Sequence, residues 1–490
     1  MKITKNFFDF NNTYIELPGK FYQKIKPEPV KKPKLIKLNH QLTNFLNLKI
    51  SSLKNYSGIS ILSGNQVPEN TVPIAMAYAG HQFGNWVPQL GDGRAILLGE
   101  ILDKKGLRRD IQLKGCGPTP FSRMGDGRAW LGPILREYIL SEAMENLGIP
   151  TTRALTAIST GEKVYREKEF PGAILTRVAF SHIRVGTFQY FASRKDLDGL
   201  KTLADYVINR HYENCIKDSN PYLSLLKKVI KRQANLVAKW MGVGFIHGVL
   251  NTDNTSIFGE TIDYGPCAFM DEYQFNKVFS SIDQTGRYAY KNQPAIIKWN
   301  LACLASCLLP LISENEKQAI SLAQSAVDEF DDIYNSLWLK IFRNKLGFRK
   351  ISEDDEKLIK DLLDLMDKNK TDFTLTFRSI SSLINNDDED FKKYFISDNN
   401  EWINKWRDRL SIEDNDKKDI FKFINSINPA FIPRNHRIEE IISKALEGDY
   451  SYFEILNKVL MKPYDDQDKF KEYQKSPQEN QIVTETFCGT

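Results

Sequence analysis

The residues best suited to chemistry stand close together near the middle of the chain. Asp253 and Asn254 are adjacent, and Asp263 follows Asp253 by ten positions. Carboxylate and amide oxygens suit Mg²⁺ or Mn²⁺, and Mg²⁺ typically takes one or two carboxylates together with substrate phosphates. Apolar, strand-like pieces frame these residues and predict a β-hairpin over 246–266. The segment is therefore either a metal and phosphate site or a polar hairpin in which Asp and Asn form the turns.

Glycines upstream favour the first of these two interpretations. Eleven of the 28 glycines fall in residues 80–133, whereas residues 301–490 contain only three. Glycine gathers where the backbone must turn tightly or approach a ligand closely. We therefore expect the active region in the first half of the chain and helical support over the last 190 residues.

A β-hairpin carries the first candidate phosphate-binding residues. Strands are predicted over 95–102 and 108–114, with a turn at 103–106, and Gly91 and Gly93 stand just before the first strand. No helix follows these glycines, so the dinucleotide-binding fingerprint fails, and no GxxxxGK[ST] motif is present. A glycine turn between strands is how protein kinases cover the phosphates of ATP. Any tight β-turn would look similar.

The tetrapeptide GDGR occurs twice, at 91–94 and at 125–128. In both copies an arginine that can meet a phosphate follows the glycine turn. Each copy alone could be a plain Asp-Gly turn. Two copies with the same following arginine favour an anion-binding site.

Lys114 closes the second strand, and a helix is predicted from about 133 to 147. Proline in its first turn and glycine at its end bound this helix. Glu137 lies near its start. A buried lysine needs a carboxylate, and a strand lysine paired with a glutamate of the next helix is the kinase arrangement. Glu142 and Glu145 are other candidates for this pairing, and Glu137 could instead face solvent.

Two arginines follow the helix near the end of another strand. A β run over 173–178 contains Arg177, and Arg184 comes seven positions later. The guanidinium group is planar and bidentate, so the two side chains could form a fork for a triphosphate. Surface salt bridges are the alternative. His182, which lies between them, is expected to be a packed or exposed histidine rather than a catalytic one.

Composition limits the class of protein. The 490 residues predict two or three lobes, and 41% hydrophobic with 26% charged residues is typical of a soluble globular protein. A net charge of +5 indicates no basic face for nucleic acid. Six cysteines without a CxxC pair or a His/Cys cluster argue against zinc and against a disulfide-stapled fold.

The N-terminus and the most apolar stretch predict a cytoplasmic protein. The N-terminus has neither a signal-peptide nor a transit-peptide pattern. The most apolar stretch, 299–312, is too short to span a bilayer. We therefore expect neither a membrane nor a nucleic-acid partner. We expect a monomer, although no feature of the sequence decides the oligomeric state.

Taken in order, the chain presents a glycine turn, a strand lysine, a helix glutamate and Asp-Tyr-Gly, as protein kinases do. Two features depart from the kinase pattern. His247 and Gly248 stand where kinases have HRD. Asp253 and Asn254 are adjacent, whereas kinases separate the aspartate and the asparagine by four residues.

Long segments of the chain carry a closer match. They are YAGHQFGNWVPQLGDGRAILLGE, QLKGCGPTPFSRMGDGRAWL, REYILSEAM, GFIHGVLNTDN, and DYGPCAFMDEY followed by GRYAYKNQP. In these segments the chain resembles the selenoprotein O family, which are protein adenylyltransferases with a kinase fold. The segments run from about 75 to 300, and the C-terminal half and the terminal CGT also look like the family. The resemblance therefore covers nearly the whole chain.

The resemblance implies an α+β fold, two-lobed and protein-kinase-like, with an extended helical C-terminal region. We place an N-terminal arm at 1–50 and the N-lobe, with the glycine turns, Lys114 and Glu137, at 51–195. The C-lobe with the catalytic hairpin follows at 196–312, and the helical extension at 313–490.

The resemblance also implies a reaction. ATP would bind flipped relative to a kinase, so that AMP is joined to a Ser, Thr or Tyr hydroxyl of a protein and pyrophosphate leaves. Asp253 would be the general base, Glu137 would orient Lys114, and Asn254 with Asp263 would hold Mg²⁺ or Mn²⁺. The nucleotide contacts would be Gly91, Gly93, Arg94, Lys114, Asp126, Gly127, Arg177, Arg184 and Asp263. An ordinary kinase and a non-catalytic, ATP-binding pseudokinase scaffold are the alternatives.

The cysteines bear on regulation. Many members of the family end with selenocysteine or cysteine, and some form a regulatory disulfide to a cysteine beyond Asp-Tyr-Gly. Cys488 is present here, but residues 268–302 contain no cysteine, and Cys267 is the only nearby partner. We therefore do not expect redox control by that bond. An ordinary cysteine in place of selenocysteine favours a bacterial protein.

Overall fold

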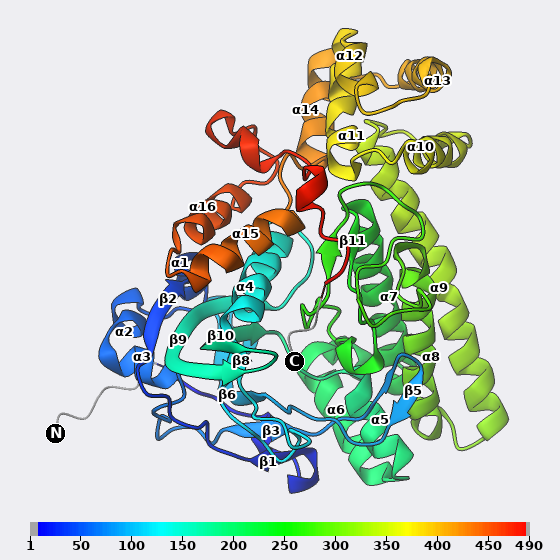
Figure 1. The fold of residues 1–490 in the computed structure, drawn as a ribbon. Coiled ribbons are helices and arrows are strands. Elements are labelled where there is room, and N and C mark those ends of the chain that lie inside the picture. The colour runs from blue at the N-terminus through cyan, green and yellow to red at the C-terminus, as the bar shows by residue number, and fades with distance from the viewer. Residues whose placement is uncertain (1–7, 487–490) are drawn as a thin grey trace.

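The computed structural model describes residues 8–486 and consists of a sheet-rich lobe and a helical region (Figure 1). Eight antiparallel strands of the described chain form the main sheet. In order across the sheet they are β1 (Tyr22–Lys24), β3 (Ile74–Met76), β6 (Ala95–Leu102), β7 (Arg108–Lys114), β10 (Glu169–Ala179), β9 (Arg153–Tyr165) and β2 (Lys34–Leu38), while β8 (Ala129–Trp130) pairs with β10. The observed fold has the two-lobed, mixed character predicted for it.

Both faces of the sheet are covered, since the central strands β6 and β7 are buried at nearly every position. In β6, Leu97 packs with α4 (Leu131–Asn146), whereas Ile96 and Leu98 pack on the opposite face. Successive side chains of a strand point to opposite faces, so an unbroken apolar run needs cover on both. The opposite face is covered by α1 (His40–Phe45), α2 (Ile50–Lys54) and α3 (Tyr56–Leu62).

The segment predicted as an N-terminal arm contributes two strands to this sheet. β1 pairs with β3 and β2 pairs with β9, so the two strands lie at opposite ends of the strand order. Tyr14 and Phe21 of the same segment are buried in the main core. The boundary drawn at residue 50 stays a prediction.

Helices build the second lobe and pack as one core with α4. α7 begins at Pro221, directly after Asn220, whose side chain accepts a hydrogen bond from the backbone N–H of Leu223. Such an N-cap satisfies a donor that the first helical turn leaves unpaired. Figure 1 shows α7 beside α8 and α9, and the three helices contact one another. The helices of this lobe are α5 (Val185–Ser193), α6 (Leu197–His211), α7 (Pro221–Gly242), α8 (Gln293–Ile312) and α9 (Glu316–Lys345).

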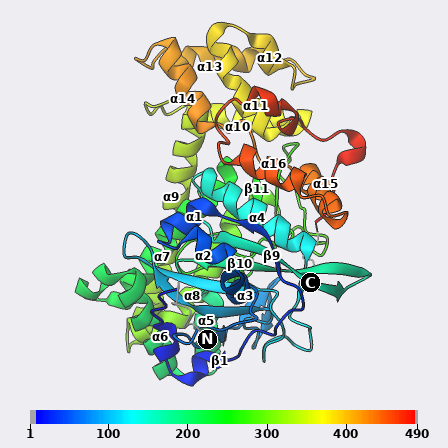
Figure 2. The ribbon, with the colours of Figure 1, turned by 90° about the vertical axis from the view of Figure 1, so that its left-hand side faces the viewer.

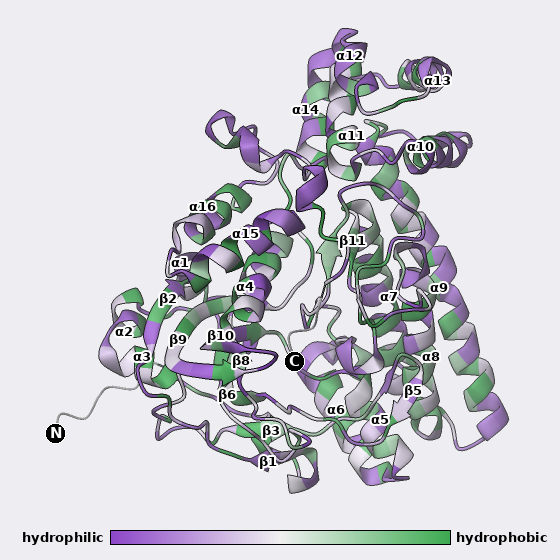
Figure 3. Ribbon diagram, viewed as in Figure 1, coloured by the Kyte–Doolittle hydropathy of each residue, from purple (hydrophilic) through white to green (hydrophobic). Residues whose placement is uncertain are grey.

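The C-terminal region is helical, as predicted, and residues 313–486 contain no strand. One group of helices surrounds a second core that includes Trp402 and Trp406. That group is α10 (Asp355–Asn369), α11 (Phe373–Ser379), α12 (Asp388–Lys392), α13 (Asn400–Leu410) and α14 (Lys417–Ile427). The last two helices, α15 (Asn435–Leu446) and α16 (Ser451–Leu460), return to pack on α4 (Figures 1 and 2). Figure 3 shows hydrophilic residues spread along these outer helices, as expected where one face meets solvent.

One apolar helix is longer than the sequence suggests, and it corrects the length argument made for residues 299–312. It runs over Tyr290–Ile312, 23 residues, and is the one helix of the described chain long and apolar enough to cross a membrane. This is weak evidence for a membrane span, because a core helix can have the same length and composition. α8, its main part, packs against α7 and α9, with Leu301 and Leu304 buried in the main core.

Two local predictions upstream of the site are confirmed. β6 and β7 have the predicted bounds, with the turn between them. α4 begins at Leu131, two residues before the predicted start, and Gly148 beyond its end has a φ of 73°. This left-handed conformation costs glycine little, which is why glycine ends helices.

The hairpin predicted over 246–266 is wrong. Only the flanks of the segment pair, as β11 (Phe245–Ile246) with β12 (Ala268–Phe269), and a 3₁₀ turn over Thr252–Asn254 lies between them. The intervening backbone bonds instead to residues that precede it: the N–H of Val185 donates to Thr255, and that of Thr261 to Pro150. The strand-like pieces therefore bond to residues near 150 and 185 rather than to each other.

Candidate active site

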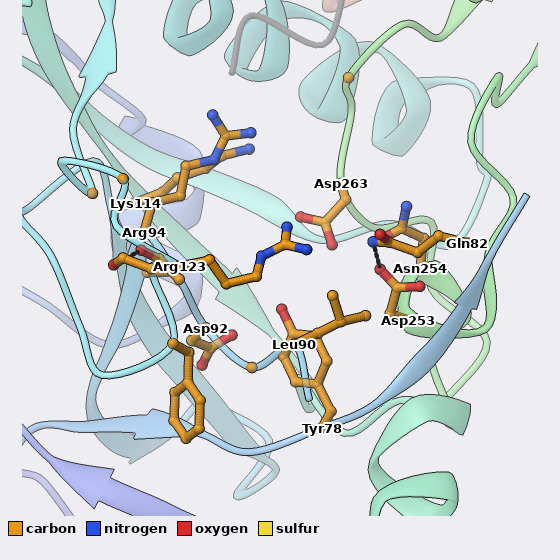
Figure 4. Close-up of a pocket in the computed structure, with 18 of the residues that line it drawn as sticks. Tyr78, Gln82, Leu90, Asp92, Arg94, Lys114, Arg123, Asp253, Asn254 and Asp263 are labelled. Carbon is orange, nitrogen blue, oxygen red and sulfur yellow. Dashed lines mark hydrogen bonds between the residues drawn. The ribbon is translucent and has the colours of Figure 1, made fainter. Parts of the chain in front are cut away.

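A cavity of about 450 Å³ lies between the glycine turns and the 246–266 segment (Figure 4). Figure 4 shows Lys114, Arg94 and Arg123 on one side and Asp253 and Asn254 on the other, with Asp263 between them. Every predicted contact and ligand residue lines this cavity: Gly91, Gly93, Arg94, Lys114, Asp126, Gly127, Arg177, Arg184, Asp253, Asn254 and Asp263. The fold therefore gathers residues that are up to 172 positions apart in the chain, from Gly91 to Asp263.

Lys114 and Glu137 form the ion pair expected between a strand lysine and a helix glutamate. The Nζ of Lys114 lies 2.5 Å from Oε2 of Glu137, and both side chains are buried. Burial, helped by nearby Arg177 and Arg94, lowers the pKa of Lys114 to about 8 against the opposing effect of Glu137. The other two candidates, Glu142 and Glu145, pair with Arg153 instead.

Asp263 stands at the centre of the charged cluster. Its backbone has a φ of 63°, a left-handed conformation that is uncommon outside glycine and is often found at functional sites. Nη2 of Arg177 donates to its Oδ1 at 2.6 Å, and Nη1 of Arg184 donates to its Oδ2. Burial alone would raise the pKa of Asp263, but Arg184, Arg177 and Lys114 outweigh it and hold the pKa well below its usual range. The carboxylate is therefore ionised.

The two arginines have protein partners that the fork hypothesis does not include. Arg177 also donates from Nε to Oε1 of Glu137, so it connects the lysine-glutamate pair to Asp263. Arg184 also donates to the backbone oxygen of Asp253 at 2.6 Å. Both arginines are buried, which excludes surface salt bridges, and both line the cavity. Their contact with a triphosphate stays a prediction.

Asp253 lies in the 3₁₀ turn with its side chain buried. The Nε2 of Gln82 donates to its Oδ2 at 3.0 Å. Burial raises the pKa of Asp253 to about 6, with Gln82 and Arg184 acting in the opposite direction. A carboxylate with this pKa is mostly ionised at neutral pH and can still accept a proton.

Asn254 presents an oxygen suited to a cation. Its Nδ2 donates to the backbone oxygen of Val249 at 2.8 Å, which assigns the amide orientation and leaves Oδ1 as an acceptor. No group of three or more His, Cys, Asp or Glu side chains among residues 8–486 could hold a metal. A Mg²⁺ site made of one carboxylate, one amide oxygen and substrate phosphates does not require such a group. The donor set of Asn254 and Asp263 fits that description.

His182 and His247 are structural. Nδ1 of His182 lies 2.9 Å from Oδ2 of Asp110, in a fully buried position, as expected of a packed histidine. Nε2 of His247 lies 2.9 Å from the backbone oxygen of Ile262, the residue before Asp263. His247 therefore connects the start of the 246–266 segment to the backbone that carries Asp263.

Sequence reasoning missed several residues that line the cavity. Tyr78 lies under the guanidinium of Arg184, whose Cζ is 4.6 Å from the ring centroid. Arg123 has a φ of 50° and extends toward the centre of the cavity in Figure 4. Gln82, Asp92 and Asn251 are among the other missed residues. A signal for Gln82 was available, because it precedes a Phe-Gly turn within one of the matched segments.

Comparison with known proteins decides the family. The family model described as "Protein adenylyltransferase SelO" matches residues 5–461. The chain is 55% identical to the "Protein nucleotidyltransferase YdiU" of Rhodopseudomonas palustris strain BisB18 over 487 residues, which is 99% of each chain. It is 54% identical to the protein of the same name in Rhizobium meliloti strain 1021 over 488 residues, again 99% of each. The chain belongs to the SelO family.

Membership of the SelO family confirms the resemblance, the kinase-like fold and the nucleotidyltransferase class. The chain is an enzyme of the kind that transfers AMP from ATP to protein. The relatives named above are bacterial. Cys488 lies outside the described residues.

Proposed function

We propose that this SelO-family cavity binds ATP in the reverse of the kinase direction and transfers AMP to a Ser, Thr or Tyr hydroxyl of a protein. Arg177 and Arg184 line the cavity beside Asp263, and the supporting observation is that two further cations, Lys114 and Arg94, lie on the side of the cavity opposite Asp253. A polyphosphate directed toward these cations would leave the α-phosphate facing Asp253. The physiological acceptor would then be a protein with an accessible hydroxyl.

The nucleotide side of the site works by positioning and charge. Lys114 is held by Glu137 and reaches the cavity, so its ammonium is fixed before ATP arrives. Gly91, Gly93, Gly127 and their neighbours bring backbone close to the phosphates. Preorganised charge of this kind needs no rearrangement during the reaction and supplies much of the catalysis of phosphoryl-type transfers.

The cation would be Mg²⁺ or Mn²⁺, held by Asn254 and Asp263. When bound, it would neutralise charge on the phosphates. The two arginines keep the Asp263 carboxylate ionised and aimed at the cavity, and its oxygens have further lone pairs for a cation.

Asp253 would act as the general base. Its carboxylate takes the proton of the acceptor hydroxyl as the hydroxyl oxygen attacks the α-phosphorus. The bond from the α-phosphorus to the bridging oxygen breaks, and pyrophosphate leaves with that electron pair. A pKa of about 6 suits this step, because the base is ionised at neutral pH yet basic enough to hold the proton.

Labelled ATP tests the proposal. We expect label at the α position to reach protein, and Asp263→Ala to abolish the transfer. Asp364→Ala, which changes an exposed aspartate of α10, serves as the matched control and should transfer normally. Transfer from the γ position only would favour an ordinary kinase. Nucleotide binding without transfer from either label would favour a pseudokinase scaffold.

A second variant separates the base from the binding residues. Asp253→Ala should lower the transfer rate while leaving the affinity for ATP nearly unchanged, because a general base acts chiefly in the transition state. Isothermal titration with a non-hydrolysable ATP analogue measures the affinity. A large loss of ATP affinity in this variant would argue against the role of Asp253 as the general base.

A further inference from the structure

A small hairpin from the N-lobe lies on the turn that carries Asp253. It consists of β4 (Gly80–Gln82) and β5 (Asn85–Val87), joined by a turn at 83–84 with positive φ at both positions. In Figure 4 this blue ribbon passes beside Asp253 and Asn254. The hairpin and the turn are about 170 residues apart in the chain, so only the tertiary fold brings them together.

Successive residues of the hairpin bond to successive residues of the turn. The backbone N–H of His81 donates to Oγ1 of Thr252 at 2.7 Å. The backbone N–H of Phe83 donates to Oδ1 of Asn251 at 3.1 Å. Gln82 lies between them, and its side chain reaches Asp253. The hairpin is therefore bonded to the catalytic turn on both sides of Gln82.

One oxygen of Asp253 is closed off by the same hairpin. Oδ1 is buried and has no hydrogen-bond partner among residues 8–486. A Cβ added to Gly80 would lie only 2.6 Å from Oδ1, so the backbone of β4 covers this oxygen directly. The other oxygen, Oδ2, is the one left for the acceptor hydroxyl. It is also the oxygen to which Nε2 of Gln82 donates, at 3.0 Å.

We propose that Gln82 is a positioning residue for proton transfer, which holds Oδ2 of Asp253 in place for the acceptor hydroxyl. The inference rests on the proposed function, in which Asp253 is the base. A carboxylate oxygen has two lone pairs, so Oδ2 can accept from Gln82 and from the hydroxyl together. A side chain on a hairpin bonded to the turn fixes the carboxylate more firmly than a side chain on a free loop would. Small misplacements of a reacting group cost large factors in rate.

Two substitutions isolate the hydrogen bond. Gln82→Leu removes both polar atoms of the amide. Gln82→Met also removes them but keeps the length of the side chain, and it replaces Gln82→Leu if that variant does not fold. Asn85→Ala is the matched control, because Asn85 pairs with Gln82 across the hairpin, is exposed, and makes no side-chain hydrogen bond within residues 8–486. Thermal unfolding checks that each variant is folded.

We expect both Gln82 variants to lower kcat for AMP transfer about 10- to 100-fold, with KM for ATP changed less than about twofold. The control should keep the unaltered kcat. A merely structural defect of the hairpin would instead lower kcat in the control as well, or raise KM for ATP. Either of those results, or a Gln82→Leu enzyme with full kcat, overturns the inference.

A double-variant comparison separates this inference from the proposed function. Gln82→Leu should cost no further activity in an Asp253→Asn background, since the two residues act as one unit. An equal loss in both backgrounds would overturn the positioning assignment. If Asp253→Asn itself keeps full activity, the base assignment fails, and Gln82 fails with it. If Asp253→Asn is inactive but Gln82→Leu is fully active, only the Gln82 inference fails.

Discussion

The two GDGR turns have identical sequences and different structures. In the first, Asp92 is buried, and its Oδ2 accepts a hydrogen bond from the backbone N–H of Met76 at 3.1 Å. In the second, the side chain of Asp126 is 46% exposed and forms an ion pair with Arg166 at 2.8 Å. Asp92 therefore stabilises the backbone of the N-lobe, whereas Asp126 lies at the rim of the cavity.

The glycine that needs a left-handed backbone also differs. It is the first glycine of one copy, Gly91 with a φ of 84°, and the second glycine of the other, Gly127 with a φ of 62°. The first turn leads into the long strand β6 and the second into the two-residue strand β8. The tetrapeptide thus predicts a turn, whereas the strand that follows and the packing around it decide which residues face the cavity.

The largest difference between the copies should appear when their left-handed glycines are changed to alanine. A Cβ at Gly127 would lie 2.0 Å from the backbone oxygen of Gly117, whereas one at Gly91 would meet the ring of Phe121. The backbone near Gly127 cannot move aside as easily as a side chain can. Gly127→Ala should therefore lower the free energy of unfolding by about 3–5 kcal/mol, and Gly91→Ala should lower it by about 2–3 kcal/mol. Urea unfolding measures both.

Gly106→Ala is the control for backbone strain alone, because Gly106 has a φ of 74° and open space around it. It should cost about 1–2 kcal/mol. If all three variants lose the same free energy of unfolding, the different packing around the two turns does not contribute to stability.

The arginines of the two copies should differ next. The guanidinium of Arg94 makes no hydrogen bond or ion pair within residues 8–486, whereas Nη2 of Arg128 donates to Glu28 at 3.0 Å. Arg94→Ala should weaken ATP binding by about 1.5–3 kcal/mol, the usual worth of a hydrogen bond to a charged group. Arg128→Ala should weaken it by less than about 1 kcal/mol. Calorimetric titration with an ATP analogue gives both values, and equal losses would mean that the two turns meet the nucleotide alike.

The aspartates should differ in stability rather than in binding. Asp92→Ala leaves the buried N–H of Met76 without its acceptor and should cost about 1–3 kcal/mol. Asp126→Ala removes a partly exposed ion pair and should cost less than about 1 kcal/mol. The midpoint of chemical unfolding measures the difference. A larger loss of stability for Asp126→Ala than for Asp92→Ala would contradict the expectation that Asp92 contributes more to the stability of the fold.

The smallest effect concerns pH. Burial, Arg177 and Arg94 lower the pKa of Lys114 to about 8, so ATP affinity should fall as pH rises through about 8 and the ammonium loses its proton. Arg94→Ala removes one neighbouring cation and should raise the pKa of Lys114, so the fall in ATP affinity should move to higher pH. Arg128→Ala should leave it in place. Binding measured across the range from about pH 7 to 10 tests this, and an unmoved fall in affinity in Arg94→Ala would exclude the coupling.

Much of the fold upstream of the site could be predicted because the deciding interactions are local. The β6–β7 hairpin follows from alternating residues around a short turn, and α4 from apolar spacing bounded by proline and glycine. The pairing of Lys114 with Glu137 was predicted among three candidates, because the order of strand lysine and helix glutamate is that of a kinase.

The failures involve interactions between distant residues. The strand-like pieces of 246–266 have the composition of a hairpin, yet their backbone bonds to residues near 150 and 185. The hydrogen bonds of Arg177 and Arg184 to Asp263 were not predicted, because Asp263 lies 86 and 79 positions further along the chain. No local pattern encodes such contacts, because each depends on how separate elements pack.

The sequence by itself determined the family, the kinase-like order of elements and eleven of the residues that line the cavity, since these depend on residue type and on long matched segments. Only the tertiary structure decided how those residues are held. In the folded protein Asp92 is buried, whereas Asp126 is partly exposed. Two arginines bond to Asp263, and Gln82 bonds to Asp253. The physical reason is that residue type sets what a side chain can do, whereas burial and distant partners set its charge, orientation and reach.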